Sequence, residues 1–151
     1  MNGWDWQPLL SQPLLCLLTF PLRWLPAGWV PREAIRRGMA STGEVVLLID
    51  GTSGLENMGR QNFKDCVQIV DSYHALEHAG LVLAALIGKD HPDYKARHHR
   101  WAKRLLKDKV QALIEQTRRE CASKPRAQAV EKELGYFVRN IKRMPDGTFR
   151  A

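Results

Sequence analysis

The stretch from residue 67 to residue 78 reads Val67-Gln-Ile-Val-Asp-Ser-Tyr-His-Ala-Leu-Glu-His78 and joins a strand pattern to a helix pattern. Its first four residues, Val67-Gln-Ile-Val70, are mostly apolar and predict a short strand. Asp71 follows, at the junction between this strand and the helix. Residues three and four apart share one face of a helix, so His74, Glu77 and His78 are predicted to point together. A polar cluster directly after a strand indicates a functional site.

A second strand pattern lies upstream of this stretch. Residues 45–49 are continuously apolar, which is typical of a strand buried on both faces, and Asp50-Gly51 follows them. Residues 55–63 between the two strands predict a crossover helix, so the strands are expected to be parallel. Asp50 and Asp71 would then lie at the same edge of the sheet, although an Asp-Gly pair after a strand is also a common turn.

The remaining patterns are helical. The expected helices span residues 32–37, 73–86, 94–122 and 127–143, and Gly88 is a good terminator for the second of them. The predicted organisation is a leader over residues 1–31, a partial α/β unit over residues 32–72 and a helical, basic region over residues 73–151. The fold class is α/β at its start and helix-dominated overall.

The first 31 residues differ from the rest because tryptophan, leucine and proline are mixed through them. Five prolines there exclude a continuous membrane-spanning helix, so no membrane partner is expected, and an atypical, disordered leader is predicted. The three cysteines are widely spaced and form no C-x-x-C pair, which argues against a disulfide framework or a zinc knuckle. A reducing, cytoplasmic setting is therefore expected.

The chain of 151 residues has a formal net charge of +7, and its basic excess is confined to one part. Residues 91–151 hold sixteen Lys and Arg against seven Asp and Glu, which predicts a polyanionic partner such as DNA. The predicted phosphate contacts lie near the end of the last helix and beyond it, at Arg139, Lys142, Arg143 and Arg150. A second basic stretch, Arg97-His-His-Arg-Trp101, has residues that can stack on or neutralise nucleic acid, but a solvated helix face with the tryptophan in the core is the more common arrangement.

Two kinds of metal chemistry fit the polar residues. Carboxylates at neighbouring strand ends can share Mg²⁺ for phosphoryl transfer, and such sites usually need three acids. His74-Ala-Leu-Glu-His78 also spells H-x-x-E-H, a zinc-hydrolase pattern that needs a third ligand, for which Glu131 or Glu133 can be nominated. A hydrogen-bonded, half-buried histidine pair that holds the helix to the sheet is the structural alternative.

Three stretches carry a resemblance to a known family. They are Leu48-Ile-Asp-Gly51, Gln68-Ile-Val-Asp-Ser-Tyr-His-Ala-Leu-Glu-His78, and Leu134-Gly-Tyr-Phe-Val-Arg-Asn-Ile-Lys-Arg-Met144 followed by Thr148-Phe-Arg-Ala151. Over roughly residues 32–151 the chain resembles the ISKra-type DDE transposases of bacterial insertion sequences. The resemblance implies a ribonuclease-H-like catalytic fold, two divalent ions (Mg²⁺ or Mn²⁺), transposon ends as the DNA partner, and a homo-oligomer in the full-length form.

The resemblance also assigns roles to single residues. Asp50 matches the second catalytic acid, a metal ligand, and Asp71 to His74 is similar to the C/D-x-x-H signature shared with Mutator-like and hAT-like transposases. Tyr73, Glu77 and His78 would support that signature. The helices that follow it would be the insertion that separates the second acid from a catalytic glutamate.

Departures from the family pattern limit the expected activity. Thr52-Ser-Gly-Leu-Glu56 stands where aromatic residues are usual, and neither the first catalytic aspartate nor the final glutamate is found. We therefore expect an internal or truncated transposase fragment that binds DNA without catalysing strand transfer. The alternatives are a small zinc-dependent hydrolase built on His74, Glu77 and His78, or a purely structural helical DNA-binding module.

Overall fold

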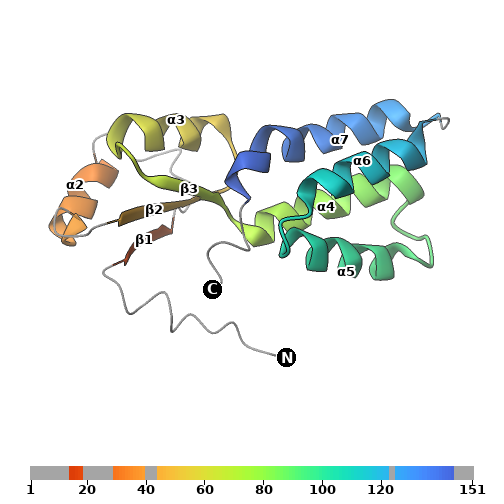
Figure 1. Ribbon diagram of the computed structural model, residues 1–151, viewed down its shortest axis with the longest axis horizontal. Helices are drawn as coiled ribbons and strands as arrows, with labels where there is room; N and C mark the ends of the chain where they lie inside the picture. The colour runs from red at the N-terminus through yellow and green to blue at the C-terminus, as the bar shows by residue number, and fades with distance from the viewer. Residues whose placement is uncertain (1–13, 19–28, 40–43, 123–124, 145–151) are drawn as a thin grey trace. The chain divides into compact units, whose positions relative to one another are not determined.

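The computed structural model describes residues 14–18, 29–39, 44–122 and 125–144. They belong to two compact units, residues 1–69 and residues 70–151. Helices dominate the described part, which contains the α-helices α2 to α7 and one three-stranded sheet (Figure 1). None of these helices has both the length and the apolar character needed to cross a lipid bilayer.

The first unit is built on the sheet. Its elements are β1 (Leu14–Leu18), α2 (Trp29–Arg36), β2 (Glu44–Ile49), α3 (Ser53–Asn62) and β3 (Val67–Val70), of which the last residue, Val70, is counted with the second unit. The strand order is β1-β2-β3, and β1 runs parallel to β2 with Leu14 opposite Glu44 and Leu18 opposite Leu48. Parallel neighbours need a crossover connection, and α2 stands between β1 and β2 in the chain.

The two strands predicted from the sequence are confirmed as β2 and β3, and they are neighbours in the sheet. Within β2, Leu47 and Ile49 are fully buried, while the alternating residues Val46 and Leu48 are half-buried. Successive side chains of a strand point to opposite faces. The prediction of burial on both faces is therefore correct for one face of β2 and only partly correct for the other.

A glycine sets the distance between α3 and the sheet. A Cβ atom placed on Gly59 would lie 2.5 Å from Leu47 Cδ2 and 2.6 Å from Gln68 Nε2, both closer than real Cβ contacts. The Gln68 side chain also donates a hydrogen bond of 3.2 Å to the carbonyl oxygen of Glu56 on α3. Because only a hydrogen occupies the place of Cβ at Gly59, α3 can lie directly on β2 and β3.

The prediction of a disordered leader over residues 1–31 needs correction. Residues 14–18 form β1, and α2 begins at Trp29, so this segment contributes a strand and the start of a helix. The run Leu14-Leu-Cys-Leu-Leu18 suits a strand because all its residues are apolar. An upstream strand is therefore present, but it carries no carboxylate.

The second unit is a four-helix arrangement. Its helices are α4 (Ser72–Ile87), α5 (Tyr94–Leu105), α6 (Val110–Cys121) and α7 (Ala127–Asn140), followed by the 3₁₀ turn η3 (Ile141–Arg143). α4 packs against α5 and α7, and α6 packs against the same two helices, so the four helices close around one core. Phe137 lies at its centre, with its ring 5.3 Å from that of Trp101 between centroids.

The single helix predicted over residues 94–122 is wrong, because the chain turns between α5 and α6. Asp108 adopts a positive φ of 55°, its amide donates to the Leu105 carbonyl, and the Lys109 amide donates to the Arg104 carbonyl. This pair of bonds is the Schellman arrangement that ends helices, and aspartate tolerates the left-handed conformation better than most residues. The turn lets α5 and α6 lie against each other.

The predicted ends of α4 are confirmed. The Asp71 carboxylate accepts a hydrogen bond of 3.1 Å from the Tyr73 amide and caps the N-terminus. Gly88 follows the last turn with a φ of 89°. An aspartate side chain readily caps the first turn of a helix, and glycine adopts a positive φ easily because it has no Cβ atom.

Candidate nucleic-acid interface

Asp50 stands directly after β2, as the sequence predicted. Its carboxylate accepts a hydrogen bond of 2.8 Å from the Thr52 amide, and Gly51 between them has a φ of 84°. This geometry is an Asx turn, in which the aspartate side chain closes the exit of the strand. Asp50 thus has a local structural role in addition to any role in binding.

Asp71 stands after β3, the strand next to β2, and caps α4. Asp50 and Asp71 belong to different units of the molecule, and their predicted meeting at one edge of the sheet stays a prediction. Tyr73, assigned to the supporting signature, is strongly exposed.

The histidines of α4 come together as predicted. His74 Nδ1 lies 3.3 Å from a carboxylate oxygen of Glu77, and the His74 and His78 rings meet edge to face with centroids 5.4 Å apart. Tyr136 of α7 completes the cluster, because its ring stacks on His78 with centroids 3.6 Å apart and planes within 10°. The cluster therefore joins α4 to α7.

Burial lowers the pKa of His78, and the neighbouring His74 lowers it further. The Nδ1 atom of His78 is buried without a hydrogen-bond partner among the described residues. A neutral imidazole stacked on a phenol ring is a packing element. His78 is half-buried, as the structural alternative expected, but it packs against α7 and its Nδ1 forms no hydrogen bond among the described residues.

The zinc-hydrolase pattern lacks a metal-binding arrangement. Within the described ranges, no group of three or more His, Cys, Asp or Glu side chains is placed to hold a metal ion. Glu131, nominated as a third zinc ligand, forms an ion pair with Arg118 of α6 instead. Around Asp50, likewise, these ranges supply no set of acids that fits the two-ion site of a DDE enzyme.

The basic residues predicted to contact phosphate lie partly at the end of α7. Arg139 and Lys142 are exposed, Arg143 is half-buried, and its Nη2 lies 3.5 Å from the Arg139 carbonyl oxygen. Arg150 lies outside the described residues. The acids Glu131 and Glu133 balance Lys132 and Arg139 within α7 itself.

Among the helices that the structure describes, α5 has the largest excess of positive charge. That helix carries five Lys or Arg residues and no Asp or Glu, whereas α6 and α7 each carry equal numbers of both signs. The five are Lys95, Arg97, Arg100, Lys103 and Arg104. The lysines and Arg100 are exposed, and the other two arginines are half-buried.

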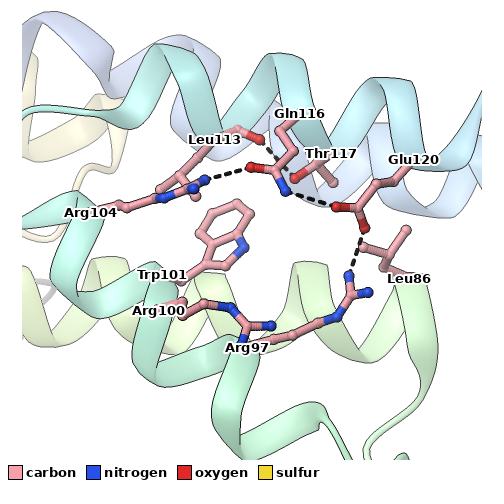
Figure 2. Close-up of a pocket in the computed structure, with 9 residues that line it drawn as sticks. All are labelled: Leu86, Arg97, Arg100, Trp101, Arg104, Leu113, Gln116, Thr117 and Glu120. Carbon is pink, nitrogen blue, oxygen red and sulfur yellow. Dashed lines mark hydrogen bonds and ion pairs between the residues drawn. The ribbon is translucent and has the colours of Figure 1, made fainter.

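Three of these arginines line a pocket between α5 and α6 (Figure 2). Its volume is about 130 Å³, and Trp101 lies among the residues that surround it. The lining residues are Leu86, Arg97, Arg100, Trp101, Arg104, Leu113, Gln116, Thr117 and Glu120. Arginines three and four residues apart share a helix face, which explains why all three reach one pocket.

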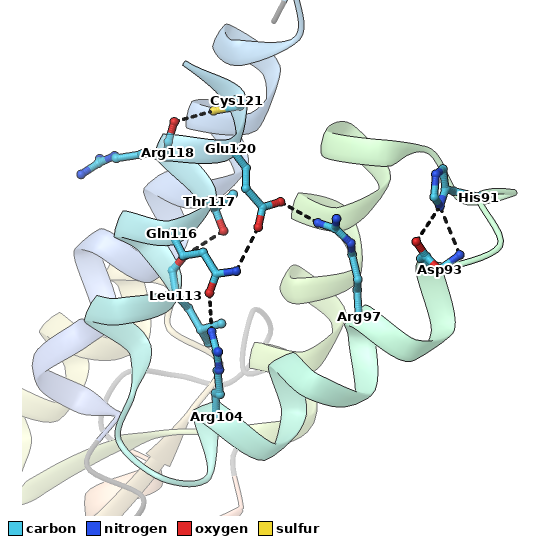
Figure 3. Close-up of polar contacts among 10 residues, drawn as sticks. All are labelled: His91, Asp93, Arg97, Arg104, Leu113, Gln116, Thr117, Arg118, Glu120 and Cys121. Carbon is cyan, nitrogen blue, oxygen red and sulfur yellow. Dashed lines mark hydrogen bonds and ion pairs between the residues drawn. The ribbon is translucent and has the colours of Figure 1, made fainter. Parts of the chain in front are cut away.

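A chain of polar contacts fixes the two outer arginines (Figure 3). Arg104 donates to Gln116 Oε1 at 2.5 Å, Gln116 donates to Glu120 at 2.9 Å, and Arg97 Nη1 lies 2.6 Å from Glu120. These bonds also join α5 to α6. Arg100 takes part in none of them.

The sequence interpretation of residues 97–101 was partly right. Trp101 is buried, as predicted, and His98 packs inward, with its Nε2 3.0 Å from the Leu76 carbonyl oxygen. His99 and Arg100 are exposed, as a solvated face requires, but Arg97 and Arg100 also line a pocket, which the sequence interpretation did not predict. The missed signal was the spacing of Arg97, Arg100 and Arg104 in a helix without acids.

In comparisons with known proteins, no family model, no curated protein and no solved structure matches the chain.

Proposed function

We propose that this chain is a DNA-binding part of a DDE-type transposase. The observation that carries the DNA-binding role is the positive charge of α5, which holds five cations and no anion of its own; one of the five, Arg97, is ion-paired with Glu120 of α6. Double-stranded DNA attracts such a surface through release of its condensed counterions. The other helices of the same unit contribute no comparable surplus.

The order of the elements supports the transposase assignment, which originates in the resemblance. Asp50 follows β2, and Asp71 to His74 begin the helix after β3, which is the next strand of the sheet. Three further α-helices, α5, α6 and α7, come after the helix that carries this signature. The proposal therefore places a partial ribonuclease-H-like unit first and a helical DNA-binding insertion after it.

No catalytic step is assigned to the described residues. Asp50 is one carboxylate held in an Asx turn, and a two-ion site needs several carboxylate ligands. We expect the purified chain to bind DNA and not to perform Mg²⁺-dependent strand transfer. Strand transfer by the chain alone would show that a complete catalytic centre forms.

Fluorescence anisotropy with a short, labelled DNA duplex tests the proposal. The dissociation constant of the purified chain is measured over a series of salt concentrations without Mg²⁺. The logarithm of that constant should rise linearly with the logarithm of the salt concentration, with a slope of about 0.9 for each phosphate neutralised. The D50N variant should bind equally well, because Asp50 offers no positive charge to DNA.

Two results would count against the proposal. Absence of binding at low salt would remove the DNA-binding role altogether. Binding whose affinity does not change with salt would mean that α5 does not neutralise phosphates, since charge neutralisation and salt dependence are linked.

A further inference from the structure

We infer that the α5–α6 pocket is a phosphate-binding site that seats one backbone phosphate of bound DNA. The inference rests on the proposed function and adds to it the place where DNA is held. It moves the main contact from the end of α7, where the sequence analysis put it, to α5.

The charge of the pocket fits a phosphate. Its lining includes three arginines and one carboxylate, so two positive charges remain uncompensated. Arginine presents several N–H donors in a plane, an arrangement that matches the oxygens of a phosphate. The volume of about 130 Å³ exceeds the roughly 30 Å³ share of one water molecule several times over, which leaves room for a phosphate group.

The donors are fixed before a ligand arrives. Arg97 is held by Glu120 and Arg104 by Gln116, and each bond engages one terminal nitrogen of the guanidinium. The other N–H groups of these two guanidinium groups are therefore held in place before binding, so ordering them on a ligand costs little additional entropy. Such preorganisation favours binding, because the side chains lose little further freedom when the ligand enters.

Two donors still lack an acceptor. The Nε atom of Arg97 is buried and has no hydrogen-bond partner in the described part of the chain. Arg100 lines the pocket and forms no hydrogen bond or ion pair with the described residues. Buried donors are nearly always satisfied in folded proteins, so an acceptor such as a phosphate oxygen is expected for Arg97 Nε. Arg100 is exposed, so its guanidinium is accessible to the same ligand.

The surroundings favour a DNA phosphate over a free phosphate ion. Lys95 and Lys103 are exposed on the same helix, outside the pocket lining, and extend the positive charge along α5. A small ion fills only the pocket and leaves these lysines without counter-charge. A polyanion can place one phosphate in the pocket and others near the lysines.

A matched pair of variants tests the inference by DNA anisotropy. R100A removes a pocket cation, and K103A removes an exposed cation of the same helix that does not line the pocket. Neither residue forms a hydrogen bond or ion pair with the described residues, so both variants should keep the wild-type thermal unfolding midpoint. R100A should weaken DNA binding about tenfold, the loss expected for charge-assisted hydrogen bonds, and K103A only about twofold.

R100K makes the test specific to geometry. Lysine keeps the charge and loses the planar set of donors, so its affinity should lie close to that of R100A. Equal DNA affinities for R100A and K103A would overturn the inference, because the pocket would then act only through its charge. Recovery of wild-type affinity in R100K would overturn it for the same reason.

A second measurement, the unfolding midpoint in the presence of inorganic phosphate, distinguishes a DNA phosphate from a free phosphate ion as the ligand of the pocket. Together with the DNA titrations, it also shows whether the pocket assignment or the proposed function has failed. If R100A binds DNA normally but loses a phosphate-induced rise in the unfolding midpoint seen in the wild type, the pocket serves a free phosphate and the DNA assignment is overturned. If the wild type fails to bind DNA at all, the proposed function fails, and the DNA assignment of the pocket fails with it. If the wild type binds DNA and R100A and K103A are equally weakened, only the pocket assignment fails.

Discussion

The imidazole of His78 on α4 lies parallel to the phenol ring of Tyr136 on α7, with 3.6 Å between their centroids. The pair closes the helix arrangement, because α4 and α7 are its first and last helices. In a double-mutant cycle of H78A and Y136L, we expect a coupling energy of about 0.5 to 1.5 kcal/mol, as found for stacked rings. Urea unfolding of the four proteins measures it.

A control variant shows whether the coupling is specific. His99 is an exposed histidine on α5, so H99A should change stability by less than about 0.5 kcal/mol and should show no coupling to Y136L. Additive effects of H78A and Y136L would mean that the stacked rings contribute only through their separate burial.

The lowered pKa of His78 predicts loss of stability in acid. In the unfolded chain this histidine should titrate near its ordinary pKa of 6.5, whereas the folded protein holds its pKa lower because of burial and the neighbouring His74. The unfolded state then binds more protons as the pH falls. The contribution of His78 should be complete above about pH 6.5 and should be lost as the pH falls through the folded pKa.

The variant H78F isolates this contribution. Phenylalanine keeps an aromatic ring against Tyr136 and removes the titration. The free energy of unfolding, measured from about pH 7.5 to about pH 5, should decline less steeply for H78F than for the wild type. Parallel curves would show that His78 is not a source of the acid sensitivity.

The close packing around Gly59 on α3 predicts that adding a single methyl group there lowers the stability of the protein. In G59A the new Cβ would lie within 2.6 Å of both Leu47 and Gln68, so α3 must shift from the sheet or the two side chains must rearrange. We expect a loss of about 1 to 3 kcal/mol in unfolding free energy, the range for overpacked cores. Thermal or urea unfolding measures this loss.

Gly54 provides the matched control, because it lies on the same helix and a Cβ there would meet nothing within 4 Å. G54A should leave stability unchanged or raise it by up to about 1 kcal/mol, since alanine favours helix more than glycine does. If both alanine variants behave alike, the close approach of α3 to the sheet is not needed for stability.

Much of this fold could be predicted from local patterns. The apolar runs predicted β2 and β3. Asp71 and Gly88 predicted the two ends of α4, because each residue type has a clear capping function. The turn at Asp108 was missed because apolar spacing resumes after it, so the periodicity alone suggests one helix. The strand at residues 14–18 was missed because the surrounding prolines and tryptophans hid a short apolar run.

The candidate site was less predictable for a physical reason. The histidine cluster of α4 lies within two turns of one helix, so residue spacing alone reveals it. The pocket needs α6, which the sequence interpretation merged with α5 into one helix. Glu120 and Gln116 reach Arg97 and Arg104 only because the chain reverses at Asp108.

Glu120 is the one carboxylate among the residues that line the pocket, and its replacement should strengthen phosphate binding. The variant E120Q removes the negative charge and keeps the size of the side chain. Its one remaining oxygen can accept from Arg97, and the bond that Gln116 donates to the other carboxylate oxygen is lost. DNA affinity should rise about two- to fivefold, the effect of removing one nearby charge repulsion in a solvent-exposed setting. Stability should fall by no more than about 1 kcal/mol, because the ion pair with Arg97 is partly exposed.

Glu115 supplies the control for this last change. It is an exposed acid on the same helix that bonds with Gln111 and does not line the pocket, so E115Q alters the total charge by the same amount. Anisotropy titrations of both variants at one low salt concentration should show a gain in DNA affinity that is clearly larger for E120Q. Equal gains would mean that DNA responds to the net charge of the helices, because a general electrostatic attraction does not distinguish an acid in the pocket from one outside it.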